Sequence, residues 1–267
     1  MRRFAFTLTE LLVVISIIAL LMAIFIPALQ SSRQQAKAVL CSSNIKQLTS
    51  GLFIYETQNQ TLPYGFYAAP MMTVPPGGYA GYIQYDRTGW WWFNFIEGFY
   101  KKSDARNTVI RCPSKYLTNS KLNNNILCGN YGVNRSICKS SDDRQSRREE
   151  FVGTPLKIAD IPKSSETLLI VDSGYAIINW WHATNEPPIP LGNTIIEDTA
   201  YVPGLCINRE RDLLPGQEQD AIYGRHPNKT VNIGFVDGHI SRTRADELFV
   251  EKTNDGYKNQ TPLWVPK

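Results

Sequence analysis

A continuous apolar segment near the N-terminus constrains this chain more than any other feature of its sequence. From Leu11 to Leu29 the chain is apolar, and Ser16 is the one polar side chain in this stretch. As an α-helix the segment would be about 29 Å long, close to the ~30 Å hydrocarbon core of a bilayer. It is too long for the apolar region of an ordinary secretory signal, and no small-residue cleavage site follows it. The sequence therefore predicts a membrane-spanning helix.

Two arginines, Arg2 and Arg3, precede the apolar segment. Basic residues that flank a membrane-spanning helix tend to remain on the cytoplasmic side. We therefore expect a single pass with a cytoplasmic N-terminus, and we expect everything after about Gln30 to lie on the far side of the membrane.

Glu10 is a carboxylate at the edge of this apolar segment, where lipid would solvate its charge poorly. One interpretation is an acid in the first helical turn, which the helix dipole favours. The other is a functional carboxylate with a specific partner. Helix physics alone leaves both interpretations open.

The string Phe-Thr-Leu-Thr-Glu at residues 6–10, followed by Leu-Leu-Val-Val-Ile, closely resembles the N-terminus of type IV prepilins and type II secretion pseudopilins. The resemblance implies cleavage by a prepilin peptidase between Ala5 and Phe6 and methylation of the new amine. Glu10 would then pair with the amine of a neighbouring subunit, and Pro27 would stand where the family has a helix-bending proline. The family usually has Gly before the cut, whereas this chain has Ala5.

The same resemblance implies a structural subunit, not an enzyme, of a type II secretion pseudopilus or a type IV pilus-like filament. Such a subunit sits in the inner membrane with its head in the periplasm until it is extracted into an extracytoplasmic filament. The implied partners are the bilayer, the prepilin peptidase, the inner-membrane assembly machinery and other pilin-like subunits, and no cofactor is required. The formal net charge of +4 is too small to indicate nucleic-acid binding.

A helical stripe continues the apolar segment into the rest of the chain. The stripe consists of Cys41, Ile45, Leu48, Leu52 and Tyr55, which step by three and four residues and so share one helix face. We expect an α+β fold in which one long N-terminal helix, both membrane anchor and spine, packs on a mainly antiparallel β head. A break into two helices at the proline is the alternative, because Pro removes a backbone hydrogen bond.

Four parts of the chain follow from this pattern. They are a leader peptide at 1–5, a transmembrane and assembly helix at 6–29, a spine helix at 30–60 and an extracytoplasmic head at 61–267.

The five cysteines are Cys41, Cys112, Cys128, Cys138 and Cys206. In the expected oxidising compartment disulfides are common, and an odd number leaves at least one cysteine outside an intramolecular pair. Cys128 and Cys138 flank a short stretch that a disulfide could close, so we predict that they pair. No two cysteines have the Cys-x-x-Cys spacing of zinc or redox sites, which argues against metal ligation by cysteine.

Three short strings resemble a branch of bacterial pseudopilin-like proteins with enlarged heads. They are Cys-Ser-Ser-Asn-Ile-Lys-Gln-Leu from Cys41, Arg-Cys-Pro-Ser from Arg111, and the segment from His226 to Asp237-Gly238. In that branch nine residues usually separate the His from the Asp, whereas ten separate them here.

Strand signals dominate the rest of the head. A short buried run from Thr167 to Val171 ends at Asp172. Farther along, Asp237-Gly238 separates two strand-like runs, 231–236 and 239–243, and an Asp-Gly pair in that position predicts a hairpin with a type I′ turn.

Two kinds of ion site are conceivable. The three histidines, His182, His226 and His239, could join Asp172 and Asp237 in a metal site that would make the protein a membrane-tethered metal hydrolase. Their spacing matches no motif, and the turn already explains Asp237. Calcium near Asp255 is the better ion candidate, since major pseudopilins bind calcium in a C-terminal loop and Asn-Asp-Gly at 254–256 is an oxygen-rich turn.

Aromatic clusters at 90–95 and 180–181 suggest a further alternative, a pilin-anchored surface adhesin that binds glycans by stacking. We favour a place in the core for these rings, because consecutive aromatic side chains cannot all face one ligand.

Overall fold

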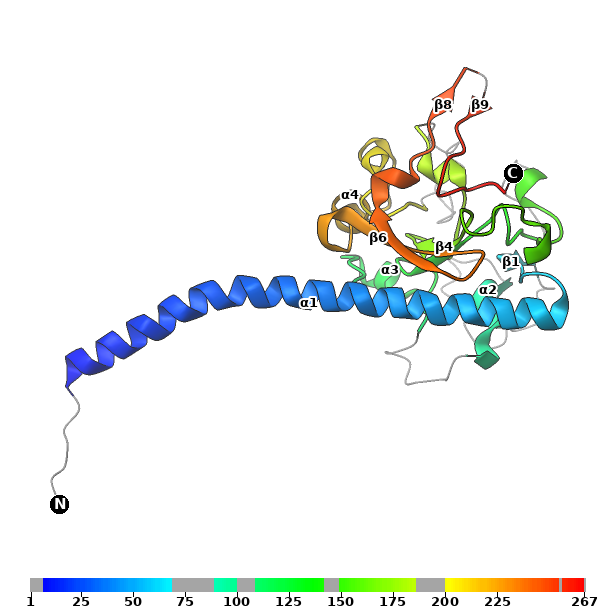
Figure 1. Cartoon of the computed structure of the whole chain (residues 1–267). Helices are drawn as coiled ribbons and strands as arrows, with labels where there is room; N and C mark the ends of the chain where they lie inside the picture. Colours follow the sequence, from blue (N-terminus) through cyan, green and yellow to red (C-terminus); the bar gives the residue numbers. More distant parts are fainter. Residues whose placement is uncertain are drawn as a thin grey trace.

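One long helix, α1 (Leu8–Asn59), organises the structure, a computed structural model that describes residues 7–68, 89–99, 109–141, 149–185, 200–254 and 256–266. The C-terminal half of α1 lies along the head, and the N-terminal half projects away from it (Figure 1). With 52 residues, the helix is about 78 Å long. The predicted fold class, α+β with a long N-terminal helix on a mainly antiparallel head, is confirmed.

The helix α1 has a definite start and end and no break between them. Thr7 caps its N-terminus, and Gln60, with φ 65°, ends it by donating its backbone N–H to the carbonyl of Glu56 at 2.7 Å. The helix runs through Pro27, so the alternative of two separate helices is wrong. It bends within its N-terminal half, the half that contains Pro27 (Figure 1).

Packing against the head begins at Ala38. Residues 7–37 are all exposed, and the buried residues of α1 are Ala38, Cys41, Ile45, Leu48, Thr49, Gly51 and Leu52. The expected stripe is therefore the buried face, except that Tyr55 at its end is only half-buried.

The main sheet has five strands in the order β5-β3-β4-β6-β7. Its strands are β3 (Tyr131–Asn134), β4 (Leu168–Asp172), β5 (Ile177–Ile178), β6 (Thr230–Phe235) and β7 (Ile240–Arg244). The β3–β4, β4–β6 and β6–β7 pairs are antiparallel, and the β3–β5 pair is parallel. The mixed sheet is thus mainly antiparallel.

Short elements complete the described head. Two small antiparallel pairs join β1 (Phe66–Tyr67) to β2 (Trp90–Trp91) and β8 (Lys252–Thr253) to β9 (Gly256–Tyr257). The short α-helices are α2 (Trp92–Phe95), α3 (Ser120–Asn124) and α4 (Glu218–Tyr223). The 3₁₀ turns are η1 (Glu97–Phe99), η2 (Glu149–Phe151), η3 (Ile158–Asp160), η4 (Trp180–Ala183), η6 (Cys206–Glu210), η7 (Pro227–Lys229) and η8 (Ala245–Leu248).

Each face of the main sheet has its own apolar core. On one face the buried stripe of α1 packs with residues of β3 and β4, among them Val133 and Ile170. On the other face Val231, Ile233 and Phe235 of β6 pack with the C-terminal segment. The alternation along β6 follows from the two-residue period of a strand, which points successive side chains to opposite faces.

The aromatic clusters belong to these cores. Trp91 and Trp92 are each 1% exposed, Phe93 is buried with them, and Trp180 is buried in the core on the opposite face. The expectation that these rings fill the core is met, and the described residues of both clusters form no exposed stacking surface.

The β6–β7 connection contains Asp237 and Gly238. The N–H of Gly238 donates to the carbonyl of Phe235 at 3.0 Å, so Val236 and Asp237 are the central residues of the turn. Gly238 has φ 91°, whereas Asp237 is not among the residues with positive φ. The expected type I′ turn is therefore wrong, because that turn needs positive φ at both central residues.

Candidate functional site

The first candidate functional feature is the exposed arm of α1, residues 7–37, which does not pack against the head. Its large apolar side chains, from Leu8 through Leu29, are exposed. By length and composition α1 is able to cross a membrane. Contiguous apolar surface on this scale is not left in water by soluble monomers, so lipid or other protein chains must cover the arm.

Three polar side chains of the arm, those of Thr7, Glu10 and Ser16, form hydrogen bonds within the helix itself. Ser16 Oγ donates to the carbonyl of Leu12 at 2.7 Å. Thr7 and Glu10 form a capping box, in which the Glu10 N–H donates to Thr7 Oγ1 at 3.3 Å and the Thr7 N–H donates to Glu10 Oε2 at 2.9 Å. Internal satisfaction of this kind is what a helix in lipid needs.

The capping box bears on the two interpretations of Glu10. Thr7 Oγ1 also donates to Glu10 Oε2, at 2.7 Å, so in the single chain Glu10 acts as a first-turn acid. An ionised carboxylate offers about four acceptor positions on its two oxygens. Pairing with the amine of another subunit therefore remains compatible with the cap and stays a prediction. Ala5 and Phe6, the predicted processing residues, lie outside the described residues.

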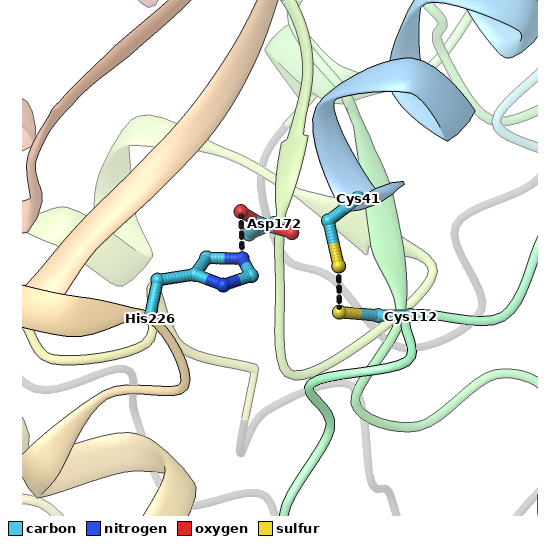
Figure 2. A group of neighbouring side chains, drawn as sticks. All are labelled: Cys41, Cys112, Asp172 and His226. Atoms are coloured by element: carbon cyan, nitrogen blue, oxygen red, sulfur yellow. Dashed lines mark hydrogen bonds and ion pairs between the residues drawn. The ribbon is translucent and has the colours of Figure 1, made fainter. Parts of the chain in front are cut away.

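A second feature is buried in the head where α1 first meets it. Figure 2 shows Cys41, Cys112, Asp172 and His226 gathered from four separate parts of the chain. We call these four residues the buried cluster. Each offers a donor atom, and these atoms all lie within 4.8 Å of one another.

Two close contacts organise the buried cluster. The sulfur atoms of Cys41 and Cys112 are 2.8 Å apart, and His226 Nε2 is 3.0 Å from Asp172 Oδ2. The side chains of the latter pair have no exposed surface. The imidazole and the carboxylate lie on one side and face the two sulfurs on the other (Figure 2).

Two polar atoms of the buried cluster have no hydrogen-bond partner. Asp172 Oδ2 accepts from the backbone N–H of Asn232 at 2.7 Å and from its side-chain amide at 3.0 Å, whereas Asp172 Oδ1 has no partner. His226 Nδ1 is likewise buried without one. An unmet polar atom in a dry interior costs free energy, so each such atom requires an explanation.

The electrostatics of the cluster make His226 and Asp172 an ion pair. Burial opposes the charge on His226, but the carboxylate of Asp172 outweighs burial and raises the pKa of His226 to about 9. Burial likewise opposes the charge on Asp172, but His226 outweighs it and lowers the pKa of the carboxyl. Burial raises the pKa of the Cys112 thiol well above its ordinary value.

Polar contacts hold the parts of the chain that carry the cluster. Asn44 donates its side-chain amide to the carbonyl of Arg111 at 3.3 Å, which joins α1 to the segment of Cys112. Asn130 Oδ1 accepts from the Cys112 N–H at 3.0 Å. These contacts fix the two cysteine-bearing segments relative to each other.

Arg225 fixes the segment of His226. The helix α4 ends at Gly224, with φ 77°, and the chain then turns Arg225 and His226 inward. The guanidinium of Arg225 forms a buried ion pair with Asp220 at 2.5 Å and donates to the carbonyls of Gly129 and Asn130, both at 2.9 Å. It thereby ties His226 to the same loop that holds Cys112.

The other candidate residues lie elsewhere. His239 Nδ1 is 2.6 Å from Asp237 Oδ1 at the exposed hairpin, and His182 Nδ1 accepts from the backbone N–H of Asn179 at 3.3 Å. The three histidines therefore do not converge, and among the described residues only His226 joins Asp172. The conceived site of histidines with Asp172 and Asp237 is wrong.

Two further predictions remain untested. Cys128 and Cys138 are both buried, and their pairing stays a prediction, although the close sulfur contact in the structure is between Cys41 and Cys112. Asp255, the candidate calcium residue, lies outside the described residues.

Sequence reasoning missed the buried cluster, and a signal for it was present. The three short strings that resemble the large-headed branch each contribute one member of the cluster, namely Cys41, Cys112 and His226. The fourth member, Asp172, ends the run that the pattern marked as a buried strand. The resemblance of all three strings to one branch, rather than the spacing within any one of them, was the usable signal.

Comparison with known proteins bears on the N-terminal segment. Residues 1–26 match the Prokaryotic N-terminal methylation motif. Neither the curated proteins nor the solved structures gave a match to the chain. This prepilin-type motif implies a pilin-like subunit that is processed by prepilin peptidase and assembles with other pilin-like subunits. The match ends at residue 26, so the resemblance to the large-headed branch rests on the three strings alone.

Proposed function

We propose that this protein is a pilin-like structural subunit of a type II secretion pseudopilus or a type IV pilus-like filament. In this proposal residues 6–29 anchor it in the inner membrane with the head in the periplasm, and the assembly machinery then extracts it into the filament. The observation that carries the proposal is the exposed arm of α1, whose residues 11–29 are apolar apart from Ser16. The arm is continuous with the helix under the head, and no part of the described chain covers it.

The geometry suits transfer from lipid to a filament core. In the membrane, lipid tails would cover the apolar part of the arm, residues 11–29; in a filament, the arms of neighbouring subunits would cover it instead. Both environments are apolar, so the transfer requires little net change in solvation of the apolar side chains. Packing of α1 against the head begins only at Ala38, beyond the apolar segment, so the head would stay outside the bilayer in the first state and on the filament surface in the second.

Glu10 and the amine of Phe6 would set the register between subunits. Opposite charges a few ångströms apart attract strongly where water is excluded. Because the carboxylate can keep its capping bonds to Thr7 and still accept from another donor, one residue can serve both the helix end and the neighbouring subunit.

The described residues favour neither of the other functions. The aromatic clusters at 90–95 and 180–181 are buried or half-buried, which leaves the adhesin without a described stacking surface. The His226–Asp172 pair has no exposed side-chain surface, so it offers no access to the substrate of a hydrolase.

Shearing of surface filaments tests the proposal. Cells that produce the full chain are sheared, and the filament fraction is probed with an antibody to the head. We expect the chain in filaments, lost when the assembly ATPase is inactivated while the amount in the membrane is retained. A chain that stays entirely in the membrane in cells whose filaments form normally would overturn the proposal.

A further inference from the structure

The buried cluster has an unexplained feature that lies beyond the proposed function. Two polar atoms, Asp172 Oδ1 and His226 Nδ1, are buried with no hydrogen-bond partner. They belong to the same group of four side chains whose donor atoms lie within 4.8 Å of one another. An unpartnered carboxylate oxygen beside two sulfurs points to a positively charged ligand, and Nδ1 of His226 becomes a further ligand atom once it releases its proton.

We propose that the buried cluster binds one zinc ion, held by the sulfurs of Cys41 and Cys112, a carboxylate oxygen of Asp172 and a ring nitrogen of His226. Four ligands drawn from thiolate, imidazole and carboxylate form the complete tetrahedral set of a closed structural zinc site. Because no side chain of the His226–Asp172 pair is exposed, the ion has no open position for a substrate, and its role is structural.

The contact between His226 and Asp172 suits such a site. His226 Nε2 lies 3.0 Å from Asp172 Oδ2, and the amide of Asn232 donates to the same oxygen. Hydrogen bonds of this kind orient the ligands of protein metal sites. Asp172 Oδ2 therefore helps to orient His226 and Asn232, and the unpartnered Asp172 Oδ1 is left to bind the metal.

A disulfide between Cys41 and Cys112 is the competing explanation. A disulfide would explain the close approach of the two sulfurs, which are 2.8 Å apart. It would leave Asp172 Oδ1 and His226 Nδ1 without hydrogen-bond partners. Zinc accounts for all four residues. Two thiolates at about 2.3 Å from zinc lie roughly 3.8 Å apart in a tetrahedron, so binding separates the sulfurs by about 1 Å. Each thiol and the charged imidazole of His226 release one proton to water, because zinc binds thiolate and neutral imidazole.

The position of the site gives zinc a mechanical role. Cys41 lies three residues beyond Ala38, where α1 first meets the head. The other ligands come from the segment before β3, the end of β4 and the turn after α4. The ion would thus join α1 to three parts of the head at the place where the exposed arm of α1 begins. This role does not depend on which kind of filament the protein forms.

Metal analysis of the full chain in detergent tests this proposal. Protein purified without chelator, and protein stripped with chelator and then incubated with Zn²⁺, should each contain one zinc per chain. Cys112→Ser and Asp172→Asn should lower the bound zinc at least tenfold. The matched control is Cys206→Ser, which changes the exposed cysteine outside the cluster and should retain full zinc.

Three measurements keep the test decisive if a cluster variant fails to fold. Cobalt(II) bound to the stripped parent should give an intense thiolate-to-cobalt absorption band in the near ultraviolet, and Zn²⁺ should raise the melting temperature of the parent. Peptide mapping under non-reducing conditions detects a Cys41–Cys112 disulfide. Zinc-free protein with that disulfide, zinc retained fully in Cys112→Ser, or cobalt without the thiolate band would each overturn the proposal.

Discussion

Gly234 of β6 lies so close to Thr49 of α1 that a Cβ on Gly234 would be 2.6 Å from the Thr49 hydroxyl oxygen. The same Cβ would be 2.7 Å from Ile170 Cγ2 and 3.0 Å from Ile45 Cγ2. The absence of a side chain at Gly234 therefore lets the spine helix rest directly on the main sheet.

Gly234→Ala should destabilise the head, because α1 would have to move away from β6. Overpacking of this kind costs about 1–3 kcal/mol. Denaturant unfolding of the full chain in detergent, followed by tryptophan fluorescence, measures the change. Gly98→Ala is the control, since nothing lies within 4 Å of its added Cβ. Equal effects of the two substitutions would contradict the close contact.

Gly238→Ala should also lower stability, for two reasons. Gly238 has φ 91°, and its added Cβ would be 2.7 Å from Phe53 Cε2. A non-glycine residue in the left-handed region costs about 1–2 kcal/mol, to which the clash with Phe53 adds. Gly256→Ala separates the two effects, because Gly256 has φ 133° in open space. Thermal melts should show the larger loss for Gly238→Ala, and the reverse order would refute this account of the hairpin.

The ion pair between Asp220 and Arg225 should be among the most sensitive points of the head. Both side chains have no exposed surface, and Tyr201 also donates its hydroxyl to Asp220 at 2.9 Å. Asp220→Ala would leave a buried guanidinium without its counter-charge, which costs about 3–5 kcal/mol.

The control for that substitution is the exposed pair of Lys258 and Glu251, whose side chains are 56% and 59% exposed. Lys258→Ala should change the free energy of unfolding by at most about 1 kcal/mol, because solvent screens exposed pairs. A loss on Asp220→Ala no larger than on Lys258→Ala would show that the buried pair does not hold the loop.

The sequence predicted the parts of the fold that local pattern determines. The apolar segment and the stripe from Cys41 to Leu52 predicted α1, since helix periodicity needs only neighbouring residues. The Asp237-Gly238 pair located the β6–β7 hairpin. The predicted turn type was wrong. The hydrogen bond from the Gly238 N–H to the Phe235 carbonyl makes Val236 and Asp237 the central residues, whereas the predicted turn had Asp237 and Gly238 at its centre.

The buried cluster lay beyond such reasoning because its members are distant in sequence. Cys41 and Cys112 are 71 residues apart, and His226 and Asp172 are 54 residues apart. No spacing rule covers ligands that only the tertiary fold brings together. The expected pairing of Cys128 with Cys138 followed proximity along the chain, and the conceived histidine site followed residue type alone. In the structure, α1 and the inward turn at Arg225 decide which residues meet.

Glu10→Gln should separate the two roles of Glu10. Gln at this position can keep the capping box with Thr7, but it has no charge to attract an amine. If pairing drives assembly, Glu10→Gln subunits should be processed and embedded in the membrane yet be depleted from sheared filaments, as should Glu10→Val. Loss of the cap alone costs only about 0.5–2 kcal/mol.

The control for Glu10 is Ser16→Ala, which removes a polar group bonded within its own helix and should assemble normally. Quantitative immunoblots of the filament and membrane fractions provide the measurement. If Glu10→Gln subunits enter filaments as efficiently as the parent while Glu10→Val subunits do not, Glu10 is a helix cap and the pairing mechanism is wrong.

Intact-mass analysis of the protein from membranes tests the central claim, that this is a processed pilin-like subunit, most directly. The chain is produced in cells with and without active prepilin peptidase. With the peptidase, the account predicts a protein that lacks residues 1–5, begins at Phe6 and carries one added methyl group; without it, the full chain should accumulate. A protein that still begins at Met1 in the presence of active peptidase would contradict the account.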